Sequence, residues 1–350
     1  DIEALADSLK ALVNRHYVLR CVFTEQEGKL FQRIEPADNL QLQIKDLTHL
    51  NYDAAVAQAT VYIEADNRIK FDLSVHLPLR AIFFRLPQQH AIVYLNLHHI
   101  AVDESSVNQL LQELFNRDIF EQNSHGKAQY ADYVYWQKTY LRSYAFRQQL
   151  NAYAAQLDGA PALHSLPLDF PYQAHTSNAA QQFRIALPQE LTQAAWALCE
   201  QQAITPFMLF QGAFSAFISV WTNCHDVVLG TPSILRPEDK FNQVIGCFLN
   251  LSVLRSQFSS GMTCLDVMQQ ARKLSLNLLD WQTVPFEALL EKLKPERSPL
   301  YSPLFQIMFS MHMQEPQSSL HDNGSRSSLS INRNSTKYDL TLHANVSKQS

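Results

Sequence analysis

The chain of 350 residues is 46% hydrophobic and 17% charged, a composition typical of a globular protein with a large apolar core. Its length predicts one large or two medium domains. The formal net charge of -5 gives no basic surface for nucleic acid, and no apolar run is long enough to span a membrane. The 5 cysteines are scattered and odd in number. We therefore expect no disulfide framework and no zinc site, and a cytoplasmic location.

Hydrophobic periodicity predicts alternating helices and strands in the first half of the chain. An amphipathic helix opens it, and two short strands then flank a turn at Gly28. Longer helical and strand patterns follow without a break. The expected elements are, in order, a helix over 1–20, two strands within 21–34, a helix over 52–66, strands over 79–85 and 91–97, and helices over 104–120 and 130–157.

A proline-rich stretch without periodicity, 158–178, is the best candidate for a linker. We therefore predict two mixed α/β lobes, over residues 1–165 and 166–350. A polar, Ser-rich stretch, 314–335, is predicted to be an exposed loop. The elements expected in the second half are strands over 182–187, 226–231, 249–257, 304–312 and 337–346, and helices over 188–202, 205–221, 263–279 and 285–293.

Two adjacent histidines mark the segment LNLHHIAVDESSV, residues 95–107, where a strand pattern gives way to a helical one. Alternate side chains of a strand face opposite ways, so only one of His98 and His99 can face a given cavity. Asp103 precedes the helical pattern and is predicted to be its N-cap. Because a helix N-terminus carries free amides and partial positive charge, it suits an anionic intermediate nearby.

Three interpretations of this segment are open from the residues alone. Both histidines could be satisfied by local hydrogen bonds. A metal site is disfavoured, because it needs three or four converging ligands and adjacent strand residues diverge. The third interpretation is catalysis, with one histidine as a base or an orienting group, since imidazole titrates near neutral pH.

The pattern HHxxxDxxS, formed by His98, His99, Asp103 and Ser106, resembles the signature of the condensation domains of nonribosomal peptide synthetases. Six further segments resemble motifs of this family in the family's order. The resemblance covers essentially the whole chain. The segments are RHYVLRCVF (15–23), FDLSVHLPLRA (71–81), YADYVYWQ (130–137), IGCFLNLSVLR (245–255), VPFEALLEKL (284–293) and SPLFQIMFS (302–310).

This resemblance implies an α/β fold of two chloramphenicol-acetyltransferase-like lobes, set in a V-shaped pseudo-dimer with a tunnel between them. It implies a reaction in which a carrier-bound acceptor amine attacks a donor acyl or peptidyl thioester. The substrates arrive on the 4'-phosphopantetheine arms of donor and acceptor carrier proteins, beside an adenylation domain, and the domain has no metal or cofactor of its own. We expect a monomeric unit of a larger synthetase, truncated at both ends, that binds neither nucleic acid nor membrane.

The resemblance also implies roles for single residues. His99 faces the reaction centre as a general base or as the group that orients the amine, whereas His98 is structural. Asp103 is a structural residue, and we predict Arg80 as its partner. Ser106 lies in the first helical turn, where capping is expected. The residues expected to line the tunnel are Glu104, Ser106 and Asn250, and those expected to be structural are Arg80 and Arg255.

Two positions depart from the family pattern. Tyr17 stands where the family favours glutamate, and Glu104 stands where it usually has glycine. The carboxylate could simply complement the helix N-terminus. Alternatively it narrows the tunnel, selects an unusual acceptor, or marks an inactive domain. Two alternative functions remain open: a related acyltransferase on the same fold (ester-forming, using a free acceptor, or epimerising), or a degenerate domain that binds a carrier or another partner, which only Glu104 supports. A heterocyclising domain is disfavoured, because that branch replaces the paired histidines.

Overall fold

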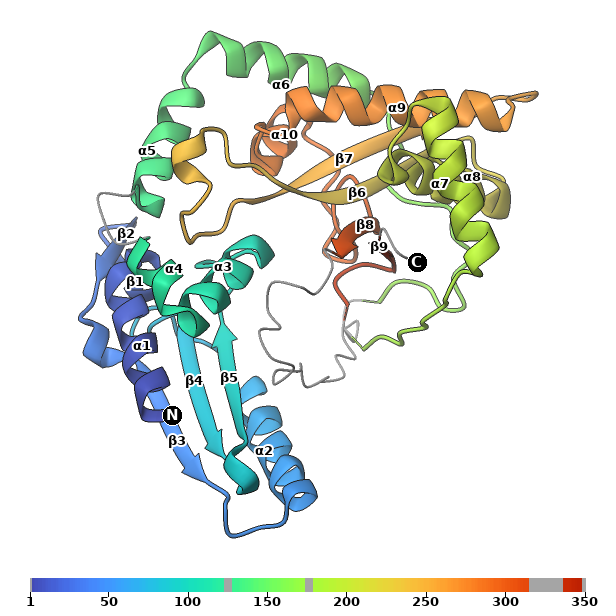
Figure 1. Cartoon of the computed structure of the whole chain (residues 1–350). Helices are drawn as coiled ribbons and strands as arrows, with labels where there is room; N and C mark the ends of the chain where they lie inside the picture. Colours follow the sequence, from blue (N-terminus) through green and yellow to red (C-terminus); the bar gives the residue numbers. More distant parts are fainter. Residues whose placement is uncertain (1, 123–127, 174–178, 315–335, 348–350) are drawn as a thin grey trace. The chain divides into compact units, whose positions relative to one another are not determined.

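The structure is a computed structural model. It describes residues 2–122, 128–173, 179–314 and 336–347. The Ser-rich stretch that we predicted as a loop, 314–335, lies outside the described residues except for its first residue. Helices and strands mix along the described chain, as the sequence predicts (Figure 1).

The chain divides into two compact units at a different place from the one that we predicted. Unit 1 is made of residues 1–139 and 236–248, and unit 2 of residues 140–235 and 249–350. The boundary predicted at 165 was wrong because helix α6 (Tyr144–Leu157) buries its apolar side chains in the core of unit 2.

The proline-rich segment 158–178 is bound to unit 2 over its described residues. The backbone N–H of His164 donates to Gln306 Oε1 at 3.1 Å. His164 Nε2 and the Tyr172 hydroxyl lie 3.0 and 2.6 Å from Asp339 Oδ2. These contacts attach the segment to the residues just before strands β8 (Ile307–Gln314) and β9 (Leu340–Ser347) of the same unit, so it is not a free linker.

Unit 1 has a three-stranded sheet in the order β3-β4-β5 and a separate hairpin, β1-β2. The hairpin turns at Glu27 and Gly28, both with positive φ, as expected for a tight two-residue turn. The elements of unit 1 are α1 (Ile2–Arg15), β1 (Cys21–Gln26), β2 (Lys29–Ile34), β3 (Gln41–Asp46), α2 (Tyr52–Asn67), β4 (Leu79–Arg85), β5 (Ala91–Leu97), α3 (Glu104–Phe115), α4 (Arg117–Gln122) and α5 (Tyr130–Tyr140).

Strand β4 is the centre of this unit, because helices cover both of its faces. Leu79, Ala81 and Phe83 pack in one core with side chains of α1 and α3. The alternate residue Phe84 is fully buried, and its ring lies 6.1 Å from that of Tyr62 on α2. A strand that is buried on both faces reads as a continuous apolar run, which β4 does.

Unit 2 has a four-stranded sheet in the order β7-β6-β8-β9, with β7 antiparallel to β6 and the other pairs parallel. Side chains of α8 pack on one face, and those of α6, α9 and α10 form a core with the other. The elements of this unit are α6, α7 (Gln189–Gln202), α8 (Pro206–Thr222), β6 (Asp226–Ile234), β7 (Leu249–Gln257), α9 (Cys264–Trp281), α10 (Phe286–Leu293), β8 (Ile307–Gln314) and β9 (Leu340–Ser347).

Several local predictions differ from the structure. The helix expected over 1–20 ends at Arg15, and the helix expected over 104–120 is interrupted at Asn116. The helix expected over 130–157 is two helices, because Ser143 caps α6 by accepting from the backbone N–H of Phe146. The strand expected over 182–187 is irregular, since it pairs with no strand within the described chain. Strand β3 was missed, because its short alternation gives only a weak signal.

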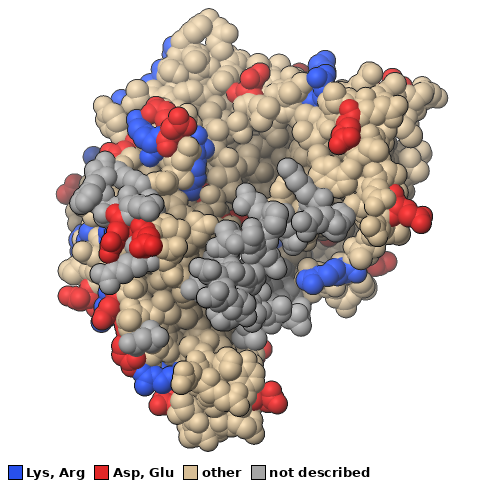
Figure 2. Space-filling model, in the orientation of Figure 1, with Lys and Arg blue, Asp and Glu red and all other residues tan. Residues whose placement is uncertain are grey.

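No single helix among the described residues is long and apolar enough to cross a membrane, although the bent pair α7 and α8 passes the same test of length and composition together. Acidic and basic side chains are interspersed among the described residues on the face shown in Figure 2. This distribution agrees with the near-neutral composition of the chain.

We predict that Tyr153→Phe destabilises unit 2. The hydroxyl of Tyr153 donates to the backbone C=O of Val253 on β7 and accepts from the N–H of the same residue. Tyr153 is 1% exposed, so loss of its hydroxyl leaves both backbone groups of Val253 without a partner. We expect the free energy of unfolding to fall by about 1–3 kcal/mol. Urea denaturation measures this, with Tyr135→Phe, 76% exposed, as the control. Equal stability of the two variants would contradict the role given to this hydroxyl.

Candidate active site

The histidine pair lies in the short connection between β5 and α3 in unit 1. The backbone N–H of His98 donates to the C=O of Pro78 at 2.9 Å, which extends the strand pairing by one residue. Its half-buried ring meets the ring of Phe71 edge to face at 5.6 Å. His98 is therefore packed into the fold, in agreement with the structural role expected for it.

The two imidazoles have opposite hydrogen-bonding partners, and this assigns their neutral tautomers. Nδ1 of His98 accepts from the backbone N–H of Ile100 at 3.0 Å, so this nitrogen carries no proton. Nδ1 of His99 lies 3.0 Å from the C=O of Val102, which can only accept, so this nitrogen carries the proton. His99 is exposed, and within the described chain its Nε2 has no hydrogen-bonding partner. The lone pair of Nε2 is thus available to a substrate.

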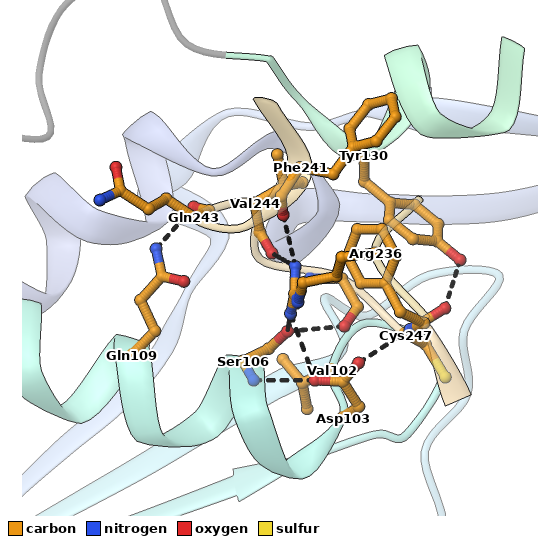
Figure 3. A network of polar contacts seen from close by, with 12 residues as sticks. Val102, Asp103, Ser106, Gln109, Tyr130, Arg236, Phe241, Gln243, Val244 and Cys247 are labelled. Carbon is orange, nitrogen blue, oxygen red and sulfur yellow. Dashed lines mark hydrogen bonds and ion pairs between the residues drawn. The ribbon is translucent and has the colours of Figure 1, made fainter. Parts of the chain in front are cut away.

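Asp103 is the N-cap of α3, as predicted, and it is 1% exposed. Its Oδ1 accepts from the backbone N–H of Ser106 at 2.8 Å. Its Oδ2 accepts from the backbone N–H of Phe248 at 2.9 Å. The guanidinium of Arg236 lies 3.6 Å from Oδ1 and completes the environment of the charge (Figure 3).

The prediction that Arg80 pairs with Asp103 was wrong. Arg80 is a cross-strand partner of Asn96, so both side chains face the same side of the sheet. There Arg80 forms an ion pair with Asp66 at the end of α2, with Nε 3.0 Å from Oδ1. Asp66 also accepts from Asn96 at 2.7 Å. Arg80 is therefore structural, but it holds α2 and not the histidine connection.

Sequence reasoning missed Arg236 as the partner of Asp103. Its guanidinium donates to the backbone C=O groups of Phe241 and Val244 at 2.7 and 2.6 Å, and it lies over the ring of Phe248. Burial lowers the pKa of Arg236, and the charge of Asp103 opposes this shift. The guanidinium nevertheless stays protonated at neutral pH, because an arginine side chain is not deprotonated in proteins. Arg236 thus holds the backbone of residues 236–248, which we call the crossing segment, and neutralises the charge of Asp103.

Ser106 joins α3 to this crossing segment. Its hydroxyl donates to the C=O of Gly246 at 2.7 Å and accepts from the N–H of the same residue at 3.1 Å. It also accepts from Arg236 at 3.0 Å, and it is fully buried (Figure 3). The expectation that Ser106 caps α3 or lines a tunnel was therefore wrong, since its hydroxyl binds the crossing segment in three directions.

Gly246 is required by the close approach of Tyr130. A Cβ at this position would lie 2.0 Å from the Tyr130 ring, where no side chain fits. The Tyr130 hydroxyl donates to the C=O of Cys247 at 2.6 Å, and burial is the main cause that raises its pKa. The motifs that contain Tyr130 and Gly246 therefore meet in one contact.

A polar row on α3 continues from the crossing segment to α1. Gln109 Nε2 donates to the C=O of Gln243 at 2.5 Å and to Glu113 Oε1 at 3.1 Å. Glu113 is buried, and its Oε2 lies 2.9 Å from His16 Nε2 and 3.5 Å from Arg15. Arg15 and His16, the first two residues of the RHYVLRCVF motif, thus bind α3 through Glu113.

Glu104 and Asn250 differ in exposure, since Glu104 is exposed and Asn250 is half-buried. Glu104 is exposed in the first turn of α3, where the partial positive charge of the helix favours a carboxylate. Asn250 donates to the C=O groups of Gln282 and Val284 at 3.1 and 2.7 Å and accepts from the N–H of Phe286. Its amide connects β7 to α10, which gives it a structural role; that it lines a substrate tunnel stays a prediction.

Arg255 has the structural role expected of it in unit 2. It donates to both carboxylate oxygens of Asp226, with contacts of 2.7–3.1 Å, and to the C=O of Asp158 at 2.6 Å. The hydrogen bonds to Asp226 are the main cause that raises its pKa. This pair fastens the end of α6 to the sheet.

We predict that Arg236→Met releases the crossing segment. The substitution leaves the buried carboxylate of Asp103 without its cation, at a cost of about 3–5 kcal/mol. Amide hydrogen exchange of Gly246 and Phe248 should accelerate, because their N–H groups donate to Ser106 and Asp103, which both lose their contact with Arg236. Lys240→Met, an exposed cation of the same segment, is the control. Unchanged exchange in Arg236→Met would contradict the anchoring role.

We further predict that Gly246→Ala and a change at Tyr130 are coupled. Gly246→Ala alone forces the Tyr130 ring to move and should cost about 1–3 kcal/mol. In a Tyr130→Ala background the added methyl group has room, so the extra cost should fall below about 0.5 kcal/mol. Denaturant midpoints of the four proteins measure the coupling. The same cost in both backgrounds would exclude the contact as the reason for glycine.

Comparison with known proteins supplies the family. A model of the condensation domain matches residues 1–350. The chain is 35% identical over 317 residues to one of the linear gramicidin synthase proteins of Brevibacillus parabrevis, an alignment that covers 88% of this chain and 4% of that protein. The chain therefore spans a small part of this relative's length.

Solved structures show the same fold at low sequence identity. The complex of the X-domain and OxyB from teicoplanin biosynthesis matches with a TM-score of 0.83 at 20% identity, over 97% of this chain and 75% of that one. The first condensation domain of the calcium-dependent antibiotic synthetase, in complex with substrate analogue 2a, matches with a TM-score of 0.70 at 18% identity, over 90% of this chain and 72% of that one. They confirm the predicted α/β, chloramphenicol-acetyltransferase-like fold class. The chain belongs to the condensation-domain family of nonribosomal peptide synthetases, whose reaction is peptide-bond formation.

Proposed function

We propose that this chain catalyses amide-bond formation at His99. An acceptor amine attacks the carbonyl carbon of a donor acyl or peptidyl thioester. The new C–N bond forms, the C–S bond breaks, the amine gives up a proton and the sulfur takes one. The products are an amide on the acceptor and a free thiol on the donor. The observation that carries this proposal is the orientation of His99, whose Nδ1 is bound to Val102 while Nε2 is left with a lone pair.

His99 fits the modest chemical demand of this reaction. A thioester is already activated, and an α-amine has a pKa of about 8, so little proton-transfer power is needed. Nε2 accepts the amine proton as a general base, an effect of about 10²–10⁴-fold in comparable enzymes. The same lone pair also accepts a hydrogen bond from the amine and orients it for attack, which adds to the effect of proximity.

The partners follow from the chemistry of the family. Condensation domains act on substrates that are carried by phosphopantetheine, so the acyl and amino substrates would arrive on donor and acceptor carrier proteins. An adenylation domain would load them. We place the reaction in the cytoplasm, where the scattered cysteines remain reduced.

A related acyltransferase that uses a free acceptor, and a non-catalytic binding domain, are the alternatives. Glu104 bears on the choice, because it could disturb the site. It is exposed on the first turn of the helix that Asp103 caps. The helix dipole favours a carboxylate at this position, and the hydrogen bonds of His99 and Asp103 are intact beside it. Both observations support an active domain.

The test uses the full-length parent protein with its neighbouring carrier domains loaded with their own substrates. Intact-protein mass spectrometry follows transfer of the donor acyl group to the acceptor carrier in wild type, His99→Ala and Glu104→Gly. We expect transfer by wild type and a loss of at least about tenfold in His99→Ala. His98→Asn, which keeps an acceptor for the N–H of Ile100, is the matched control and should lose much less.

The other outcomes decide between the alternatives. Transfer by Glu104→Gly but not by wild type would identify a silenced domain whose function is binding. Transfer in no variant to the carrier, but to an added free amine or alcohol, would identify the related acyltransferase. Equal rates in wild type and His99→Ala would overturn the role of His99.

A further inference from the structure

A row of polar side chains follows the β8–β9 strand pair in unit 2. Ser310 and His343 are direct partners in the parallel register. His312 lies two residues beyond Ser310, and Asn345 two residues beyond His343, so these four side chains share one face of the sheet. The rings of His312 and His343 are 6.3 Å apart. None of these residues takes part in the site around His99.

The contact between Ser310 and His343 fixes the tautomer of the imidazole. Ser310 is 3% exposed, and its hydroxyl oxygen lies 2.5 Å from His343 Nδ1. A buried hydroxyl needs an acceptor, and within the described chain Nδ1 of His343 is the one it has. Ser310 therefore donates to Nδ1, and in the neutral ring the proton of His343 is on Nε2.

His343 also remains neutral at physiological pH. Partial burial of its ring and the nearby charge of His312 both lower its pKa from the ordinary value near 6.5. The residue is exposed at the surface of the sheet, and β9 is the last strand in the sheet order. His343 is thus an uncharged N–H donor, and the buried Ser310 beside it on β8 holds its ring in orientation.

We propose that His343 binds a carbonyl oxygen in the chain of a peptidyl substrate. This inference rests on the proposed function, whose donor is an acyl or peptidyl thioester. An uncharged donor suits an uncharged acceptor such as an amide C=O, whereas a carboxylate would favour a charged imidazolium. Asn345, exposed on the same face, can both donate and accept, as the next peptide group of an extended chain requires. The pair selects a peptidyl chain over a plain fatty acyl chain.

Binding of two pantetheine amides to the full chain tests this inference without any transfer step. One carries a 4-oxopentanoyl group and the other a pentanoyl group, so they differ by one carbonyl in place of a methylene. Wild type should bind the oxo compound about 3- to 10-fold more tightly, the effect of one neutral hydrogen bond. His343→Phe should remove this preference. His225→Phe, a second exposed histidine of unit 2, should keep it.

The ¹⁵N resonances of labelled His343 give an independent reading of the tautomer. We expect an unprotonated Nδ1 and a protonated Nε2 in wild type, and a mixture of tautomers in Ser310→Ala. A protonated Nδ1 in wild type, or an equal preference for the oxo compound in wild type and His343→Phe, would overturn the inference. If the protein prefers the oxo compound but transfers no acyl group, the proposed function is contradicted and the inference about His343 is not.

Discussion

The buried carboxylate of Asp103 is the constraint on which the candidate site depends. A charge with 1% exposure is tolerable only if it is fully compensated, and three groups do this: the N–H of Ser106, the N–H of Phe248 and the guanidinium of Arg236. Two of them come from residues 236–248, although the carboxylate belongs to the cap of α3. The position of the helix start and the course of a distant segment are therefore determined by the same charge.

This constraint reaches His99, the residue that we propose as catalytic, through the backbone. The capping geometry of Asp103 places the preceding C=O of Val102, which in turn holds the Nδ1 proton of His99. His98 is bound in the opposite sense by the N–H of Ile100. Two adjacent and chemically identical side chains therefore have different roles, because one donates and the other accepts at Nδ1. Polar groups with complete hydrogen bonding, more than the apolar core, specify this connection.

Much of this could be predicted from the sequence, because the signals were local. Hydrophobic periods of 3.6 and 2 residues predict most of the helices and strands. The place of Asp103 just before a helical pattern predicts the N-cap of α3. The partner of Asp103 could not be predicted, since Arg236 is distant in the sequence and Arg80 satisfied the same chemical requirement. The boundary between the units failed for a similar reason: proline-rich composition suggests a linker but does not show that His164 and Tyr172 bind Asp339. The motifs of Ser106 and Asn250 suggested that these residues line a tunnel, but they did not show which backbone groups the two side chains bind.

We propose that Asp103 acts on the reaction only by holding His99. Rates of acyl transfer in wild type, Asp103→Asn, His99→Ala and the double variant test it directly, because two residues that act through one group are not additive. We expect Asp103→Asn to slow transfer on its own but to have no further effect in the His99→Ala background. A loss in the double variant equal to the product of the two single losses would contradict it.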